Sequence, residues 1–362
     1  MRILYSFNKE AFEAEHWESE ILAASDGEFS FVPFNHGLYL SPNLYLDASS
    51  LDRLYQNKDS RLQKMYKDMQ ATLSEQNLSA LLVNNCPPYH PEFLRDLNVY
   101  KVLYSGDDPV ATYLRNIPYL HAYDHVFFAS PTYSPDLDMQ EKMRYCGMVN
   151  ADWLPIGVFD YEYETSRTEH NILSRERDID IIYVGKFWRQ KIQVLADVAK
   201  AFGRQFSIYG MFGIRHNLYI NVIKGARSWV RPLSFPDRVS HYQRAKIGIN
   251  IHWSNYALGN QRLYHLPANG VMQLSDCSKD LHRVFSDGEE VVGYSSTEDL
   301  IEKLRFYLSH KEEREAIALG GYRRVMREYR LRDVLRRAGR LMQRGMERTV
   351  GARSGALSAL LP

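Results

Sequence analysis

Short apolar runs recur along this 362-residue chain, and each ends in glycine, proline or polar residues. Longer segments of helical character separate most of them; the largest, residues 50–78, is polar and places its leucines and methionines close to helical spacing. Continuous apolar strands of this kind are typical of parallel sheets that are covered on both faces by crossover helices. The pattern therefore predicts an α/β protein with a doubly wound parallel sheet.

The apolar runs fall into two sets, and a polar, charged stretch at 161–178 separates them. The expected strands of the first set are 3–7, 29–34, 80–83, 100–104 and 125–129. Those of the second set are 180–184, 205–209, a short piece near Trp229, 245–252, 271–274 and 290–294. A chain of this length is long enough for two cores. We predict an N-terminal Rossmann-like domain at 1–160, a surface linker at 161–178, a C-terminal Rossmann-like domain at 179–325, a basic helix at 326–350 and a tail at 351–362.

Charge and cysteine usage narrow the class of protein. A formal net charge of +1 argues against a nucleic-acid partner held by a general basic field. Cys86, Cys146 and Cys277 are isolated and lack metal-ligand spacing, which indicates a reducing compartment without a disulfide framework. The start, Met1 to Ser6, becomes polar too soon for a signal peptide, and no apolar run reaches the length of a membrane span. We expect a cytoplasmic protein.

The segment 259–274 gives the clearest local signal. It reads as a short helix that ends at Asn269-Gly270 and is followed by the apolar strand 271–274, while the strand 245–252 precedes it. A strand, a loop and a helix start in this order present backbone amides to an anion, and Arg262 in the first turn adds a two-pronged grip for phosphate. An ordinary helix–strand packing unit is the alternative for this stretch taken alone.

Ligands of open parallel sheets bind beyond the carboxyl ends of the strands, so the strand assignments yield candidate residues directly. Basic and amide groups dominate in the second domain, whereas carboxylates and histidines appear in the first. This division suggests a phosphate-bearing ligand on the second domain and a hydroxyl-bearing or acid–base partner on the first. The first-domain candidates are His36, His90, Asp107, Asp108 and Tyr133, and those of the second are Gly185, Lys186, Lys191, Tyr209, Gly210, Arg231, Asn250, His252 and the helix start at 259–265.

Each candidate also has a purely structural explanation. Asp107, before Asp108-Pro109, is equally suited to form a turn or cap a helix. His36 and His90 lie beside Gly37 and Pro91 and can be ordinary loop histidines. Gly185 can be simply the turn at the end of a strand, with no role in binding, although two lysines follow it in the sequence.

Several nucleotide and hydrolase motifs are absent from the sequence. No Gly-x-Gly-x-x-Gly follows a strand, and no Gly-Lys-Ser/Thr phosphate loop occurs, which argues against nicotinamide enzymes and P-loop nucleotidases. The chain also lacks a nucleophile elbow and a His-x-x-x-His zinc motif.

Three short motifs follow one another in the second domain: Val184-Gly185-Lys186 with Lys191, then Tyr209-Gly210, then Arg231-Pro232-Leu233. The first is similar to the Gly-Arg…Lys phosphate motif of the GT-B glycosyltransferases, and the others follow in that family's order. The second domain therefore resembles these enzymes, close to the retaining family 4. The helix expected at 235–244 continues the general family pattern. Residues 260–264, 269–274, 285–289 and 313–320 are more similar to the spore-maturation (CgeB-like) branch of these enzymes. The resemblance covers roughly 180–330.

The resemblance implies a GT-B fold, in which two Rossmann-like domains face each other across a cleft and the C-terminal helix returns to the N-terminal domain. It also implies transfer of a sugar from a nucleoside diphosphate donor, with no metal and no further cofactor. The donor residues it implies are Gly185, Lys186, Lys191, Tyr209, Gly210, Arg231, Leu233, Asn250, His252, Asn260, Arg262, Leu263 and His265.

The sequence departs from family 4 at both functional glutamates. The ribose-binding glutamate falls on His265, and the glutamate that serves the donor sugar falls on Ala257. These contacts, and the retaining or inverting outcome, are therefore not inherited. Asn250, His252 and Asn255 are the candidates to replace them, and the sequence does not rank them.

The predicted function is transfer of a sugar to a hydroxyl of a glycan, lipid-linked glycan or protein during assembly of a surface polysaccharide or glycoconjugate. Asp107 is the first candidate to deprotonate or orient the acceptor hydroxyl and His36 the second, with His90, Asp108 and Tyr133 as acceptor contacts. If the enzyme is retaining, Asp107 becomes an acceptor contact. Two alternatives stay open: a sugar-nucleotide epimerase, and a non-catalytic binding protein on the same scaffold.

The C-terminal helix is strongly basic, with ten arginines against three acids from Arg323 to Arg348. A basic amphipathic helix of this kind can lie on an anionic membrane surface, here the inner face of the plasma membrane. The alternative is that its apolar stripe, which includes Leu331, Val334 and Leu341, packs on the protein itself.

Overall fold

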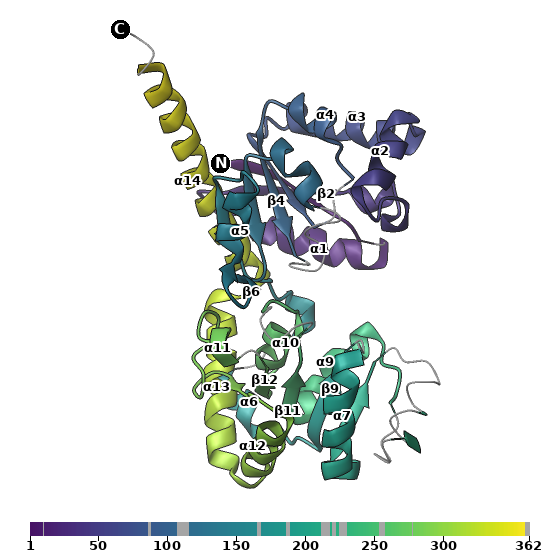
Figure 1. The fold of residues 1–362 in the computed structure, drawn as a ribbon, viewed down its shortest axis with the longest axis vertical. Coiled ribbons are helices and arrows are strands. Elements are labelled where there is room, and N and C mark those ends of the chain that lie inside the picture. The colour runs from purple at the N-terminus through teal and green to yellow at the C-terminus, as the bar shows by residue number, and fades with distance from the viewer. Residues whose placement is uncertain are drawn as a thin grey trace. The chain divides into compact units, whose positions relative to one another are not determined.

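The computed structural model describes residues 1–9, 11–85, 88–106, 116–164, 168–185, 189–210, 218, 222–223, 230–252, 258–276 and 278–358. The chain forms two compact units, each with a parallel sheet of its own (Figure 1). The first unit comprises Met1–Gly157 together with Leu331–Pro362, and the second comprises Val158–Arg330.

The sheet of the first unit has six parallel strands in the order β2-β1-β3-β4-β5-β8. The order reverses beside β1, as the predicted doubly wound fold requires. A short antiparallel pair, β6 and β7, lies outside this sheet. The strands are β1 (Arg2–Phe7), β2 (Ser30–Asn35), β3 (Ala80–Asn84), β4 (Tyr100–Ser105), β5 (His125–Phe128), β6 (Thr132–Ser134), β7 (Leu137–Asp138) and β8 (Ala151–Trp153).

Helices cover this sheet because each buries one apolar stripe. Asp59 caps α3 by accepting from the backbone N–H of Leu62, and the stripe that includes Leu62, Met65 and Met69 packs into the core. The helices of the unit are α1 (Ala11–Ala23), α2 (Ala48–Gln56), α3 (Ser60–Glu75), α4 (Pro91–Arg95), α5 (Met139–Tyr145) and α14 (Leu331–Ser358), with 3₁₀ turns η1 (His36–Leu38), η2 (Pro42–Leu44) and η4 (Ile117–Ala122).

The last helix, α14, belongs to the first unit, as the predicted return of the C-terminal helix requires. Its apolar residues Leu331, Val334 and Leu341 are buried. Gly339 lies so close to Phe29 that a Cβ there would stand 2.6 Å from the ring. The apolar stripe of α14 therefore packs on the protein itself, as the second of the two sequence interpretations proposed.

The sheet of the second unit has five parallel strands in the order β10-β9-β11-β12-β13. These are β9 (Ile179–Val184), β10 (Phe206–Tyr209), β11 (Ala245–Asn250), β12 (Met272–Ser275) and β13 (Val292–Gly293). The helices are α6 (Glu169–Ser174), α7 (Arg189–Phe202), α9 (Phe235–Arg244), α10 (Arg262–Ala268), α11 (Ser278–Leu281), α12 (Thr297–Ser309) and α13 (Lys311–Glu328), with 3₁₀ turns η5 (Asp160–Glu162) and η6 (Gly203–Gln205).

Two boundaries were predicted wrongly. The expected tail at 351–362 begins later than predicted, because α14 continues to Ser358. The segment 161–178, expected to be a surface linker, contains part of η5 and all of α6, and it buries Glu162, Tyr163 and Ile172. Ile172 packs against Gly270, where even a single methyl group would collide with it. Because most residues of the segment are charged or polar, the sequence predicts a surface position and does not reveal the few side chains that are buried.

Candidate functional site

The strand order of the second unit reverses between β9 and its neighbour β11. Gly185 follows β9 and Ile251 follows β11, so both residues lie at the carboxyl edge of the sheet where ligands of this architecture bind.

Arg262, the first residue of α10, reaches the end of β9. Its Nη1 donates to the carbonyl oxygen of Val184 at 2.9 Å, and the guanidinium packs over the Tyr183 ring at 4.5 Å. Gly185 leaves room for it, since a Cβ there would lie 2.7 Å from Nη1. The buried Nε of Arg262 has no hydrogen-bond partner among the described residues. An unused donor of a cation at a sheet switch point is suited to an anionic ligand.

Lys191, on α7, is buried at the same edge and donates from Nζ to the carbonyl oxygen of Ile251 at 2.7 Å. Burial and, to a lesser extent, the nearby Arg262 lower the pKa of its ammonium to about 8, while Asp276 partly opposes the shift. The two cations are therefore close enough to interact, and an anion beside them would relieve their repulsion.

Polar side chains after β11 and β12 complete the edge. His252 is bound to Asp276 by its backbone N–H at 2.8 Å and by Nδ1 at 2.5 Å. Asn250 is fully buried and accepts from Asn260 Nδ2 at 2.8 Å. Asp276 was not predicted, although it directly follows the β12 strand and the carboxyl-edge rule could have found it.

Two expectations about α10 need correction. The backbone N–H of Leu263 is not available to a ligand, because it donates to Asn260 Oδ1 at 3.0 Å, and the Leu263 side chain lies in the core. His265, predicted as a donor-binding residue, is buried, and its Nε2 lies 2.9 Å from Glu162 Oε2. Glu162 was missed because it lies in the segment interpreted as a linker.

The predicted base-contacting residues lie beside β10. The backbone of Arg231 pairs with that of Tyr209, and the N–H of Gly210 donates to the Arg231 carbonyl at 3.0 Å. Arg231 is exposed, whereas Tyr209 is buried against Leu233 and His241. Lys186 lies outside the described residues, as do Ala257, Asp107 and Asp108.

In the first unit, His36 is a core residue. It is fully buried, and its Nδ1 lies 2.8 Å from Ser6 Oγ. Burial lowers its pKa to about 3, so the imidazole is neutral at physiological pH. No acceptor could reach the side chain in this arrangement, which corrects its prediction as a catalytic residue.

His90 caps the short helix α4, where its Nδ1 accepts from the N–H of Glu92 at 3.3 Å. It stacks on Tyr55 with ring centroids 3.8 Å apart, and its Nε2 lies 3.2 Å from Asp52 Oδ1. Tyr133, the other described acceptor candidate, lies on β6 with Lys142 Nζ 4.9 Å above its ring.

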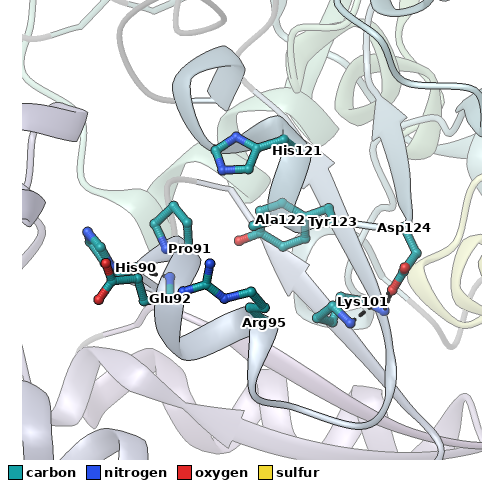
Figure 2. A pocket seen from close by; sticks show the side chains of 9 residues that line it. All are labelled: His90, Pro91, Glu92, Arg95, Lys101, His121, Ala122, Tyr123 and Asp124. Atoms are coloured by element: carbon teal, nitrogen blue, oxygen red, sulfur yellow. Dashed lines mark hydrogen bonds and ion pairs between the residues drawn. The ribbon is translucent and has the colours of Figure 1, made fainter.

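His90 also lines a pocket of about 450 Å³, shown in Figure 2. Arg95 and His121 line it from α4 and η4, and Lys101 bonds to Asp124 across its far side. Lys101 and Asp124 lie at the amino-terminal ends of β4 and β5. The pocket is therefore not the carboxyl-edge site that the sequence predicted for His90.

Within the described residues, no group of three or more His, Cys, Asp and Glu side chains could hold a metal ion. In the same part of the chain, no helix is both long and apolar enough to cross a membrane.

Two doubly wound parallel sheets in series, and a final helix that packs with the first of them, define the GT-B fold. Solved structures of that fold match over nearly the whole chain. Sucrose-phosphate synthase from Thermosynechococcus elongatus is 13% identical, with a TM-score of 0.60, and covers 95% of this chain and 98% of its own. Anabaena HepE, in complex with UDP and glucose, is 10% identical, with a TM-score of 0.57, and covers 97% of this chain and 100% of its own.

The sequence comparisons point to the same class. A family profile described as glycosyl transferase-like matches residues 189–340. The spore protein CgeB of Bacillus subtilis (strain 168) is 23% identical over 198 residues, which is 50% of this chain and 57% of CgeB. The predicted resemblance to CgeB-like GT-B glycosyltransferases is thereby confirmed.

Proposed function

We propose that this protein transfers a sugar from a nucleoside diphosphate donor to a hydroxyl group of an acceptor. The observation that supports this function most is the convergence of Lys191 and Arg262 on the switch point of the second sheet. Breaking the bond between sugar and diphosphate adds negative charge to the leaving group. Two cations held in place by backbone carbonyls would stabilise that charge without rearranging.

This arrangement supports a reaction that needs neither a metal nor a further cofactor, because protein cations take the place of a metal ion at the diphosphate. Lys186 would add a third cation from the loop after β9. Loss of Arg262 should slow transfer by about 10²–10³-fold if it stabilises the leaving group as other preorganised donors do.

The acceptor would be a glycan, lipid-linked glycan or protein in surface polysaccharide or glycoconjugate assembly. Asp107, which follows β4 in the sequence, stays our first candidate to orient or deprotonate its hydroxyl, with Asp108 beside it. His36 is no longer a candidate. For the donor, HepE is described in complex with UDP-glucose, so uridine nucleotides are the first to test.

The test is thermal unfolding with UDP, GDP, TDP, CDP and ADP and with UDP- and GDP-sugars. A ligand that binds only the folded protein stabilises it by about 2.7 kcal/mol at a hundredfold excess over its dissociation constant. We expect nucleotides of one base to raise the melting temperature of the wild type. Arg262→Ala should lose this effect, and Arg305→Ala, which replaces an exposed arginine on α12, should keep it. No response to any diphosphate would refute a donor site.

Product analysis separates this function from the two alternatives. A transferase releases nucleoside diphosphate only when an acceptor is present, whereas an epimerase converts the nucleotide sugar alone. A non-catalytic protein, which the missing glutamates favour, would bind nucleotide without releasing diphosphate with any acceptor.

We further propose that α14 brings the protein to the inner face of an anionic membrane. The helix carries seven arginines and two carboxylates in a chain of net charge +1. Arg340, Arg344 and Arg348 are exposed and make no ion pair within the described residues. Because the apolar stripe is buried, contact would be electrostatic and salt-sensitive instead of by insertion of the helix.

Exposed apolar side chains next to α14 favour a lipid surface over a soluble polyanion. Asn150 donates from Nδ2 to Thr349 Oγ1 at 3.3 Å. Shortly before it in the chain, Tyr145 at the end of α5 is 71% exposed and Val149 is 80% exposed. Such residues can enter the headgroup region while arginines bind phosphates.

Sedimentation with vesicles tests this contact. The protein should bind vesicles of phosphatidylcholine with phosphatidylglycerol and not those of phosphatidylcholine alone. Arg340→Glu/Arg344→Glu should abolish binding, while Arg204→Glu/Arg305→Glu, which makes the same charge change on exposed arginines of the second unit, should not. Equal loss in both variants would show that only net charge matters.

A further inference from the structure

The carboxylate of Glu162 is held at the centre of a buried polar cluster in the second unit. Only 3% of Glu162 is exposed. Its Oε1 accepts from Arg238 Nη2 on α9 at 3.2 Å. Its Oε2 accepts from the N–H of Phe159 at 3.0 Å and lies 2.9 Å from His265 Nε2 on α10. Within the part of the chain that the structure describes, both carboxylate oxygens therefore face groups that can donate a hydrogen bond.

The protonation states of the cluster follow from these contacts. Burial opposes charge on Glu162, yet His265, Arg238 and the Phe159 N–H together lower its pKa, so the carboxylate is ionised. Burial lowers the pKa of His265 despite the nearby carboxylate. An ionised carboxylate can only accept, so the neutral imidazole with its hydrogen on Nε2 is the tautomer compatible with this contact, which is close at 2.9 Å but lies off the direction of a hydrogen bond.

The helix bound by this cluster is the one that bears Arg262. α10 has seven residues and Pro267 lies inside it. The side chain of its N-cap residue, Gln261, does not cap the first turn, and Asn260 supplies one hydrogen bond there, from the N–H of Leu263. So short a helix depends on tertiary contacts for its stability. The carbonyl oxygen of Glu162 adds another, because it accepts from Asn269 Nδ2 at the end of α10 at 2.9 Å.

We infer that Glu162 is a positioning residue for the donor site: it fixes α10 against η5 and α9 and thereby holds Arg262 beside Lys191. This inference rests on the proposed function. The family resemblance places a glutamate on α10 itself, at the position of His265. In this chain η5 supplies a carboxylate to the histidine at that position instead.

The decisive variant is Glu162→Gln. In either orientation its amide turns an NH₂ group toward a donor, either Arg238 or the Phe159 N–H and His265. Glu164→Gln is the matched control, because Glu164 lies two residues away, is 36% exposed and pairs with Arg175 at 3.6 Å. Glu162→Asp keeps the charge, shortens the reach and serves if the glutamine variant does not fold.

Two readouts are needed, hydrogen exchange of the free protein and UDP affinity by calorimetry. We expect Glu162→Gln to speed exchange of the α10 amides about tenfold, to leave α12 unchanged and to weaken UDP binding about tenfold, with a smaller effect in Glu162→Asp. Glu164→Gln should match the wild type in both.

Unchanged exchange in α10 would overturn the inference, and so would faster exchange throughout the unit, which indicates general destabilisation. If the wild type binds no nucleoside diphosphate, the proposed function fails. The exchange of α10 then still decides whether Glu162 positions the helix.

Discussion

Raising the pH from 7 to 9 should weaken binding of a nucleoside diphosphate about tenfold, because Lys191 loses its proton in that range. Burial and Arg262 lower the pKa of the free ammonium to about 8. A bound diphosphate stabilises the ammonium and raises that pKa. Between the two pKa values the complex holds a proton that the free protein lacks, so binding weakens as the pH rises.

The magnitude follows from the free-state pKa. About nine-tenths of the Lys191 side chains are protonated at pH 7 and about one-tenth at pH 9, a loss of about 1.3 kcal/mol in binding free energy. The range lies above the phosphate's own second pKa of about 6, so ligand titration contributes little.

Calorimetric titration in two buffers of different ionisation enthalpy measures both the dissociation constant and the proton uptake. At pH 9 about one proton should be taken up for each diphosphate bound. Lys191→Arg keeps its charge, so its affinity should not change with pH, and Lys191→Met should bind weakly at every pH. A wild-type affinity that is equal at pH 7 and pH 9, or a Lys191→Arg variant with the wild-type slope, would refute the reasoning.

Three further outcomes are expected. Gly185→Ala should weaken diphosphate binding about tenfold with little change in melting temperature, because the added Cβ would lie 2.7 Å from Arg262 Nη1. If calorimetry shows that the folded variant binds with wild-type affinity, this expectation is contradicted. Gly270→Ala should lower the free energy of unfolding by about 2 kcal/mol or more in urea, because Gly270 has φ +65° and its Cβ would collide with Ile172; Ile172→Ala should restore part of the loss. His36 has a pKa of about 3 when folded and about 6.5 when unfolded, so the unfolded chain binds the extra proton. The contribution of neutral His36 to the free energy of unfolding is complete above pH 6.5 and is lost as the pH falls toward 3. In His36→Gln the urea midpoint should therefore fall less steeply between pH 7 and pH 4 than in the wild type. An equal pH dependence in the two proteins would exclude this role of His36.

The fold could be predicted because apolar runs of strand length are strong local signals. Ile181 to Val184 and Ala245 to Asn250 form strands where the sequence placed them, and the carboxyl-edge rule led to Arg262 and Lys191. These inferences require only the direction of each strand.

Side-chain partners could not be predicted in the same way. His265 is a candidate ligand residue until Glu162, 103 positions earlier in the sequence, is found beside it. Likewise, His36 is a loop histidine by its neighbours in sequence, and only the packing of Ser6 and Tyr89 around it shows that it is a core residue. Partners so distant in sequence leave no local pattern.

The membership of α14 in the first unit bears on how the molecule is made. During synthesis, residues 1–157 emerge from the ribosome before the second unit has been made. The helix that covers Phe29, however, is built from residues beyond Arg330. The second unit can complete its core while synthesis continues, whereas the first must wait with an apolar face uncovered. The half of the protein that is translated first is therefore the half that finishes folding last, and during that interval it is the natural client for a chaperone.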